Sequence, residues 1–185
     1  FQILNIDSTL DDKKEKISIN INISEGMQYQ LGNISFTGEM DVFGADELNE
    51  AISLNKGDVF NRNQVIKDIQ TLTDMYADKG YAFVNINPVT SEFLNEVNIK
   101  FDISLNKKIY INRISVSGNT RTQDEVIRRE IGISEGGLYS RSVLRESLKN
   151  LRRLGYFSDV QISTSEVDNM PDKIDVAFSV EETQT

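Results

Sequence analysis

An internal repeat is the sequence feature that most constrains the fold. Residues 114–157, "ISVSGNTRTQDEVIRREIGISEGGLYSRSVLRESLKNLRRLGYF", follow the same plan as residues 34–83. In both stretches, alternating apolar residues lead to a glycine, a short amphipathic run, a glycine-containing loop, a longer amphipathic run and a Gly-Tyr pair. A period of roughly 75–80 residues indicates two small units, each of which builds its own modest core.

The residue types that are missing exclude several kinds of chemistry. The 185 residues include neither Cys nor His, so disulfides and Cys nucleophiles are ruled out and the commonest general base is absent. Asp124 and Glu125 form an acidic pair, but the start of a predicted helix accounts for them, because the helix dipole favours carboxylates there. The Asp-rich stretches lack the spacing of a calcium loop. We therefore predict that the chain is not an enzyme and has no metal or cofactor.

The net charge and the hydropathy pattern argue against nucleic acid as a partner and against a membrane-spanning helix. A net charge of −9 disfavours nucleic acid, because binding phosphates requires a basic surface. No stretch has the run of about 18 apolar residues that a membrane helix requires, so we predict a soluble part of a protein. Phe1 begins inside an alternating apolar run, which indicates a fragment whose natural start lies upstream.

Period-2 apolar patterns predict three hairpins of β-strands. The first has Ile17, Ile19, Ile21 and Ile23 on one half-buried face and a charged turn around residues 11–14; the others occupy residues 82–105 and 157–182. We predict that residues 1–27 are the final hairpin of a preceding unit, and that residues 28–106 and 107–183 are the two complete units. The linker at residues 106–108 contains neither Gly nor Pro, which favours a fixed orientation.

Period-3.6 patterns place two helices in each unit. In the second unit, the spacing of Thr122 and Glu125 predicts a capping box at the start of the first helix, and Ser140 or Ser142 can cap the second. The apolar stripe of that second helix is Leu144, Leu148, Leu151 and Leu154, and the matching stripe of the first unit is Val65, Ile69, Leu72 and Tyr76. Five glycines are predicted at turns and helix ends: Gly38, Gly80, Gly118, Gly136 and Gly155. Each unit therefore reads β-α-α-β-β, an α+β fold.

This plan resembles that of POTRA (polypeptide-transport-associated) domains. The motifs that carry the resemblance are "SGNTRTQDEVIRREI", "EGGLYS" and "LKNLRRLGYFSDVQI" in the second unit and "FNRNQVIKDIQTLTDMYADKGYAFVNI" in the first. They look most like the fourth and fifth domains of the BamA family of outer-membrane β-barrel assembly factors, and residues 1–27 look like the tail of the third. One departure is "TGEMDVFGADE", where a Gly-Asn turn is expected. The resemblance implies tandem three-stranded mixed sheets, each with two helices on one face.

The resemblance also implies a function. In the BamA family, a transmembrane barrel follows the last POTRA domain, and "VEETQT" at the end of the chain is similar to that exit. The implied role is a periplasmic scaffold that docks accessory outer-membrane lipoproteins and receives unfolded outer-membrane β-barrel proteins. The alternative is the POTRA region of a polypeptide-translocating channel of the two-partner secretion or import type. Three units, one of them partial, disfavour translocators that have only two.

Two sets of residues are candidate contacts. A strand at the edge of a sheet can accept a client strand by β-augmentation; alternatively, such strands only complete the sheet. The candidate edge residues are Phe83, Val84, Asn85 and Ile86 in the first unit and Phe157, Ser158, Asp159, Val160, Gln161 and Ile162 in the second. The resemblance implies that Glu135 contacts an accessory lipoprotein, with Arg128 and Arg129 beside it. The alternative is a solvated loop carboxylate and surface arginines.

Overall fold

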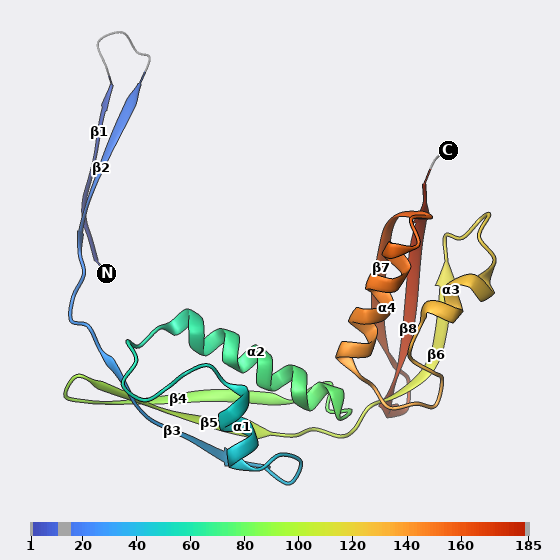
Figure 1. The fold of residues 1–185 in the computed structure, drawn as a ribbon, viewed down its shortest axis with the longest axis horizontal. Helices are drawn as coiled ribbons and strands as arrows, with labels where there is room; N and C mark the ends of the chain where they lie inside the picture. Colours follow the sequence, from blue (N-terminus) through green and yellow to red (C-terminus); the bar gives the residue numbers. More distant parts are fainter. Residues whose placement is uncertain (1, 11–15, 184–185) are drawn as a thin grey trace.

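The computed structural model describes residues 2–10 and 16–183, which form eight strands and four helices (Figure 1). In chain order these are β1 (Gln2–Leu10), β2 (Ile17–Ser24), β3 (Gln30–Gly38), α1 (Ala45–Ala51), α2 (Arg62–Asp78), β4 (Asn85–Phe93), β5 (Glu96–Ser104), β6 (Tyr110–Ser117), α3 (Asp124–Glu130), α4 (Arg141–Arg153), β7 (Phe157–Val167) and β8 (Met170–Glu182). The predicted charged turn at residues 11–14 lies outside the described residues.

The β-α-α-β-β plan is confirmed in both units. The first sheet has the order β3-β5-β4 and the second the order β6-β8-β7. In each, the outer strand before the helices runs parallel to the central strand, and the hairpin that follows the helices is antiparallel. The sheets are therefore mixed, as predicted, and the strand that follows the longer helix lies at an edge.

Each central strand supplies alternate residues to a core beneath the helices. The buried residues of β5 are Val97, Ile99, Phe101 and Ile103, and those of β8 are Ile174, Val176, Phe178 and Val180. The residues between them are exposed or half-buried in both strands. The helices therefore cover one face of each sheet. Each core is a separate cluster, although Ala77 of α2 packs into the core of the second unit.

In each unit, a buried polar side chain of the long helix binds backbone N–H groups that follow the short helix, but the residue type differs between the units. In the first unit, the buried carboxylate of Asp68 on α2 accepts hydrogen bonds from the backbone N–H groups of Ser53 and Leu54, each at 3.0 Å. In the second unit, the buried Ser147 Oγ on α4 accepts from the Gly132 N–H at 2.9 Å. In both, a side chain of the long helix satisfies backbone donors after the short helix, which would otherwise be buried without a partner.

The predicted capping box at Thr122 is wrong. Helix α3 begins after Gln123, whose side chain makes no cap hydrogen bond. The Thr122 N–H donates instead to Glu182 Oε1 at 2.7 Å, so a carboxylate from the end of β8 replaces the local cap. The caps of the long helices are local: Asn61 Oδ1 accepts from the Asn63 N–H, and Ser140 Oγ accepts from the Val143 N–H.

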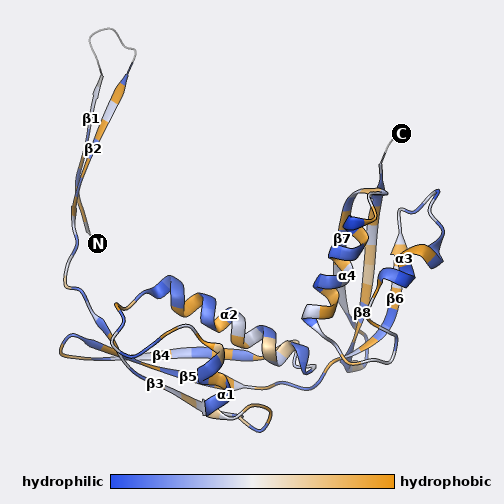
Figure 2. Ribbon diagram, viewed as in Figure 1, coloured by the Kyte–Doolittle hydropathy of each residue, from blue (hydrophilic) through white to orange (hydrophobic). Residues whose placement is uncertain are grey.

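The apolar face of the first hairpin is exposed, contrary to the half-buried face predicted for it. Strands β1 and β2 pair antiparallel, but Ile17, Ile19, Ile21 and Ile23 are all exposed, and Figure 2 shows the hairpin standing away from the helices. Two strands alone cannot bury a face against each other. Within residues 2–10 and 16–183, no helix is both long and apolar enough to cross a lipid bilayer.

Candidate interaction surfaces

Strands β4 and β7 are edge strands, and they carry most of the predicted client-strand residues. Phe157 to Ile162 lie in β7, as predicted, whereas Phe83 and Val84 do not lie in a strand. They belong to a turn in which the Val84 N–H donates to the Tyr81 carbonyl at 3.2 Å, and β4 begins only at Asn85. The edge in the first unit therefore starts two residues later than the sequence predicts.

The opposite edges, on β3 and β6, are paired at their first residues with the loops that join the helices. The Leu31 N–H on β3 donates to the Asp58 carbonyl at 2.7 Å, and the Gly57 N–H donates to the Leu31 carbonyl at 2.7 Å. On β6, Ile111 exchanges the equivalent pair of hydrogen bonds with Gly136 and Gly137. These hydrogen bonds close the β3 edge at Leu31 and the β6 edge at Ile111, so an added strand could not pair with these two residues.

Glu135 and Arg128 meet at one residue of β6. Glu135 Oε1 accepts a hydrogen bond from the Ile114 N–H at 2.8 Å, and Arg128 Nη2 donates to the Ile114 carbonyl at 3.2 Å. Arg128 also forms an ion pair with Asp124. The structure thus brings two of the three predicted contact residues together, and both close the β6 edge one step beyond the loop hydrogen bonds.

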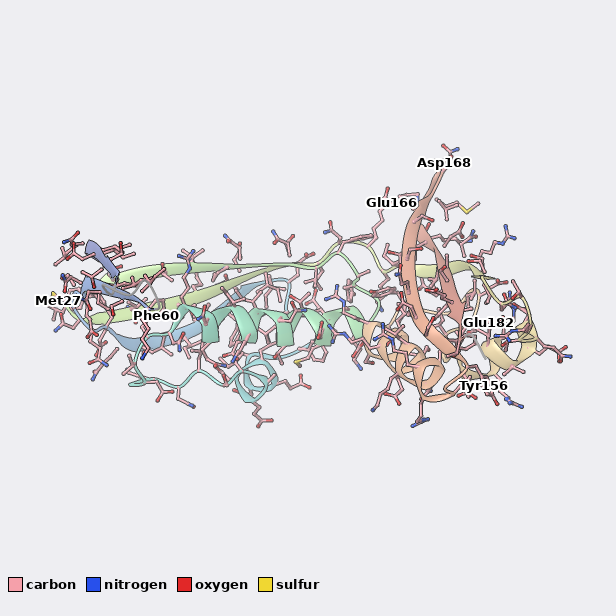
Figure 3. All side chains as sticks on the ribbon, turned by 90° about the horizontal axis from the view of Figure 1, so that it is seen from above. Met27, Phe60, Tyr156, Glu166, Asp168 and Glu182 are labelled. Atoms are coloured by element: carbon pink, nitrogen blue, oxygen red, sulfur yellow. The ribbon has the colours of Figure 1, made fainter. Side chains whose placement is uncertain are left out.

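Arg129 lies elsewhere, at the end of the second unit where the chain leaves β8. It lines a pocket with Val126, Tyr156 and Glu182. Figure 3 shows Tyr156 and Glu182 together at this end of the unit, while Glu166 and Asp168 mark the opposite end of the β7–β8 hairpin. The three predicted residues therefore do not form a single site.

Glu182 ties the end of β8 to the segment before α3. Its side chain, which is 7% exposed, accepts hydrogen bonds from Thr120 Oγ1 at 2.8 Å and from the backbone N–H groups of Arg121 and Thr122. The Thr122 backbone hydrogen bond is the largest cause that lowers the pKa of Glu182, from 4.5 to about 2. This carboxylate holds the end of the last strand in place while it is ionised.

We expect the Glu182 contacts to weaken in acid. Because the pKa of Glu182 is lower in the folded chain, its contribution to stability is complete above pH 4.5 and is lost as pH falls toward about 2. The variant Glu182→Gln should unfold at a lower temperature than the parent chain at neutral pH, and the gap should close across that window. Thermal unfolding followed by circular dichroism as a function of pH measures the gap. Glu181→Gln, at an exposed position of the same strand, is the control and should show no such window.

A network of hydrogen bonds joins the end of α2 to the start of α4. Asp74 on α2 accepts from Arg141 Nη1 at 3.1 Å and from Arg145 Nη1 at 2.6 Å. One turn later, Asp78 Oδ1 accepts from Ser140 Oγ at 2.9 Å and from the Ser142 N–H at 2.8 Å, so a residue of the first unit caps a helix of the second. We call these contacts of Asp74 and Asp78 the joint.

The backbone and the charge state of Asp74 both support the joint. The Ile109 N–H donates to the Gly80 carbonyl at 2.9 Å, and the Leu138 side chain lies where a Gly80 side chain would begin. Burial alone would raise the pKa of Asp74, but hydrogen bonds from Arg145, Arg141 and Gln70 outweigh burial and hold its pKa below 3.8. The carboxylate is therefore ionised at neutral pH, as its two arginine contacts require.

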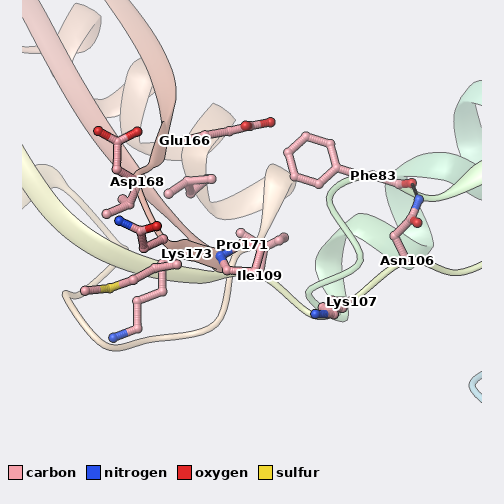
Figure 4. Close-up of a pocket in the computed structure, with 12 residues that line it drawn as sticks. Phe83, Asn106, Lys107, Ile109, Glu166, Asp168, Pro171 and Lys173 are labelled. Atoms are coloured by element: carbon pink, nitrogen blue, oxygen red, sulfur yellow. Dashed lines mark hydrogen bonds between the residues drawn. The ribbon is translucent and has the colours of Figure 1, made fainter.

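A pocket of about 620 Å³ lies on another side of the same junction (Figure 4). The linker contributes Asn106 and Lys107, the turn after α2 contributes Phe83, and the β7–β8 hairpin contributes Glu166 and Asp168. Asn106 Nδ2 donates to the Phe83 carbonyl, which fixes the linker against the first unit. Phe83, predicted to be part of a client edge, is instead a half-exposed wall of this pocket.

Sequence reasoning missed the joint entirely. Asp74 and Arg145 are separated by 71 residues, and Arg145 lies off the apolar stripe of its helix, like any solvated surface arginine. No local pattern marks a pair that forms only when two units meet.

Comparison with known families places the chain among proteins with repeats of this kind. A family model for POTRA, described as a surface antigen variable number repeat, matches residues 29–105 and again residues 109–183. The two matches coincide with the two three-stranded sheets and their helices.

Curated relatives are similar along essentially the whole chain. The outer membrane protein assembly factor BamA of Neisseria meningitidis serogroup B is 30% identical over 187 residues, which cover 100% of this chain and 24% of the relative. The protein of the same name from Nitratidesulfovibrio vulgaris is 33% identical over 183 residues, which cover 95% of this chain and 23% of the relative. The chain therefore spans only about a quarter of the length of these relatives.

Two solved structures share the fold. The POTRA3-5 segment of BamA from Haemophilus influenzae superimposes with a TM-score of 0.81 at 24% identity, covering 98% of this chain and 72% of that one. BamA from Haemophilus ducreyi lacking POTRA domains 1-3 superimposes with a TM-score of 0.75 at 24% identity, covering 85% of this chain and 30% of that one. At this level of identity the agreement establishes the arrangement of strands and helices.

Proposed function

The chain belongs to the POTRA family, and on that premise we propose that it is a periplasmic interaction scaffold of an outer-membrane protein assembly factor. The observation that carries the proposal is the similarity of the whole chain to relatives named as outer membrane protein assembly factors. In the full-length protein, a transmembrane barrel follows the second unit. The scaffold docks accessory lipoproteins and receives unfolded outer-membrane β-barrel proteins by contact, without chemical catalysis.

The arrangement of open and closed edges supports a role in receiving strands. Each complete unit leaves one edge strand, β4 or β7, to which an extended polypeptide can add by backbone hydrogen bonds. Backbone recognition tolerates many sequences, which suits a receptor for many different barrel proteins. Strands of such barrels alternate apolar and polar residues, and this alternation matches the two faces of a half-covered sheet.

The first hairpin fits the same plan. Its strands are antiparallel, like β4–β5 and β7–β8, and β2 has isoleucines at alternate positions, as β5 and β8 have apolar residues at alternate positions. We place residues 1–27 as the last hairpin of a preceding POTRA domain, residues 28–106 as one domain and residues 107–183 as the domain nearest the membrane. The exposed isoleucines of β2 would then pack beneath the two helices of that preceding domain.

The loop around Glu135 is the proposed lipoprotein contact. Oε1 of Glu135 is engaged with the Ile114 N–H, which holds the side chain in one position on an exposed loop. A carboxylate fixed in this way can pair with a basic residue of a partner without a large loss of side-chain freedom. Arg128, held on the other side of Ile114, would set the register of the contact.

We expect Glu135→Lys to weaken lipoprotein binding by about tenfold, because it replaces a favourable charge contact with a repulsive one. Titration of the isotope-labelled chain with the purified accessory lipoproteins of its own envelope, followed by amide NMR, measures the affinity. Shifts centred on residues 128–138 should appear with the parent chain. Glu135→Gln keeps an acceptor for the Ile114 N–H while removing the charge, so it separates partner contact from loop structure.

Glu146→Lys is the matched control, because it reverses an exposed charge on α4 away from this loop. It should bind like the parent chain. Unchanged affinity for both Glu135 variants would show that Glu135 makes no partner contact, and the same lipoproteins failing to bind the parent chain would contradict the docking role.

A further inference from the structure

The backbone of Val160 on the β7 edge is closed by side chains of its own unit. The Val160 N–H donates to Asp159 Oδ1 at 2.8 Å, and Arg152 Nη2 on α4 donates to the Val160 carbonyl at 3.1 Å. Arg152 Nη2 also lies 3.8 Å from Asp159 Oδ1, and Gln161 Nε2 donates to Asp159 Oδ2 at 2.7 Å. We call the pair Arg152 and Asp159 the clasp.

The position of the clasp defines which backbone groups of β7 remain open. In an antiparallel pair, alternate residues direct their N–H and C=O groups toward the partner strand and away from it. Val160 directs its groups away from β8, since side chains bind both of them. Ile162, Thr164 and Glu166 therefore also face outward, and they form three successive open positions beyond the clasp.

The β4 edge is interrupted at its centre. Ile86, Pro88, Thr90 and Glu92 occupy the outward-facing positions of β4, because Pro has no N–H and is tolerated in a strand only where that donor is not needed by the sheet. An added strand at β4 would find no donor at its second position. Proline at an edge is a known means of discouraging strand addition.

We propose that the segment of β7 from Ile162 to Glu166 is the strand-binding site of this chain, and that the clasp of Arg152 and Asp159 sets where binding begins. The partner is one extended polypeptide segment of alternating apolar and polar residues. On the helix-facing side of β7, such a segment would place its apolar residues, beginning beside the half-buried Ile162, and its polar residues would lie on the opposite, solvent-facing side of the sheet. This inference rests on the proposed function and specifies which edge receives the client.

Three variants test the site by amide NMR titration of the 185-residue chain with a synthetic peptide of alternating Val and Lys residues. In the parent chain, shifts should appear at Ile162, Thr164 and Glu166 but not at Val160. The double variant Arg152→Ala/Asp159→Ala frees the Val160 backbone, so the shifts should extend to Val160 and the affinity should rise about tenfold, since hydrogen bonds are added at one more position.

Two proline variants test which edge binds the peptide. Thr164→Pro removes the central open donor of β7 and should abolish binding there. Pro88→Thr restores a backbone donor in β4 and should create binding at that edge.

The control double variant Arg153→Ala/Asp46→Ala removes the same two charges from exposed positions elsewhere and should bind like the parent chain. A copy of the peptide with a methylated backbone should not bind, which shows that backbone hydrogen bonds carry the interaction. Equal affinity for the clasp variant and the parent chain, or binding at β4 in the parent chain, would overturn the inference while leaving the scaffold role intact. Absence of peptide binding in every variant would overturn both the inference and the receipt of client strands, whereas lipoprotein docking is decided separately by the Glu135 titration.

Discussion

Gly118→Ala should destabilise the second unit by about 3–4 kcal/mol, combining about 1 kcal/mol for a left-handed backbone with up to about 3 kcal/mol for overpacking. Gly118 has φ +87°, and a Cβ atom built on it would lie 1.9 Å from the Val180 carbonyl oxygen. That oxygen belongs to the central strand β8, so β6 and β8 would have to separate. Small domains have about 0.05–0.15 kcal/mol of stability per residue, so the variant would lose a large part of what holds this unit folded.

Urea unfolding measures the change, and amide NMR assigns it to one unit. Gly136→Ala is the matched control, because Gly136 has φ +77° but no atom within 4 Å of the built Cβ. Gly136→Ala should lower the free energy of unfolding by only about 1 kcal/mol, because only the left-handed backbone conformation disfavours alanine there. Equal losses for the two variants would mean that close packing of β6 against β8 is not what requires glycine at residue 118.

Periodic local patterns allowed most of the fold to be predicted. The alternation of Ile99 and Phe101 reflects the two faces of β5, and Gly80 and Gly155 follow the long helices with φ +94° and +73°. These features depend on neighbours a few residues away, so the sequence reveals them directly. The repeat strengthens each prediction, because the same order of strands and helices is indicated twice by independent stretches of sequence.

The predictions of local structure were wrong where the two units differ in the length of a connection, or where a distant side chain binds a backbone group in place of a local one. One residue separates Gly155 from the start of β7, but four separate Gly80 from β4, so transferring one register to both repeats placed Phe83 and Val84 in a strand. The spacing of Thr122 and Glu125 satisfies the rule for a capping box, yet Glu182, 60 residues away from Thr122, takes the donor instead. In a capping box the Glu125 carboxylate would accept from the Thr122 N–H, so two carboxylates compete for one donor. The Glu182 carboxylate also accepts from Thr120 Oγ1 and the Arg121 N–H, which hold it in place beside Thr122.

The candidate contacts were only partly predictable for the same reason. Residues 157–162 could be assigned to an edge strand because hairpin order places them there. Arg152 binds the Val160 carbonyl only because α4 packs over β7. Glu135 binds the Ile114 N–H only because its loop lies against β6. These contacts join elements that no short pattern links.

Asp74→Arg combined with Asp78→Ala should release the two units from their common orientation. The change removes two ion pairs and a helix cap, which contribute roughly 2–3 kcal/mol together, and it places a third positive charge beside Arg141 and Arg145. The Gly80 carbonyl would still accept from the Ile109 N–H, and Ala77 would still pack into the core of the second unit. These contacts lie three residues apart in the chain, so they act as a pivot about which the units can rotate. Each core lies mainly within its own unit, so the units should stay folded while their relative orientation varies.

Because the chain contains no Cys, spin labels can be attached at single introduced cysteines, Ser91→Cys on β4 and Lys149→Cys on α4. With the joint intact, the distance distribution between the labels should be narrow, and in the joint variant it should become broad. Asp46→Arg, at an exposed position of α1, is the control and should leave it narrow. A narrow distribution in the joint variant would mean that the linker and the Gly80 contact alone fix the orientation. A broad one would mean that the five side chains of the joint, those of Asp74, Asp78, Ser140, Arg141 and Arg145, determine the relative orientation of the two units.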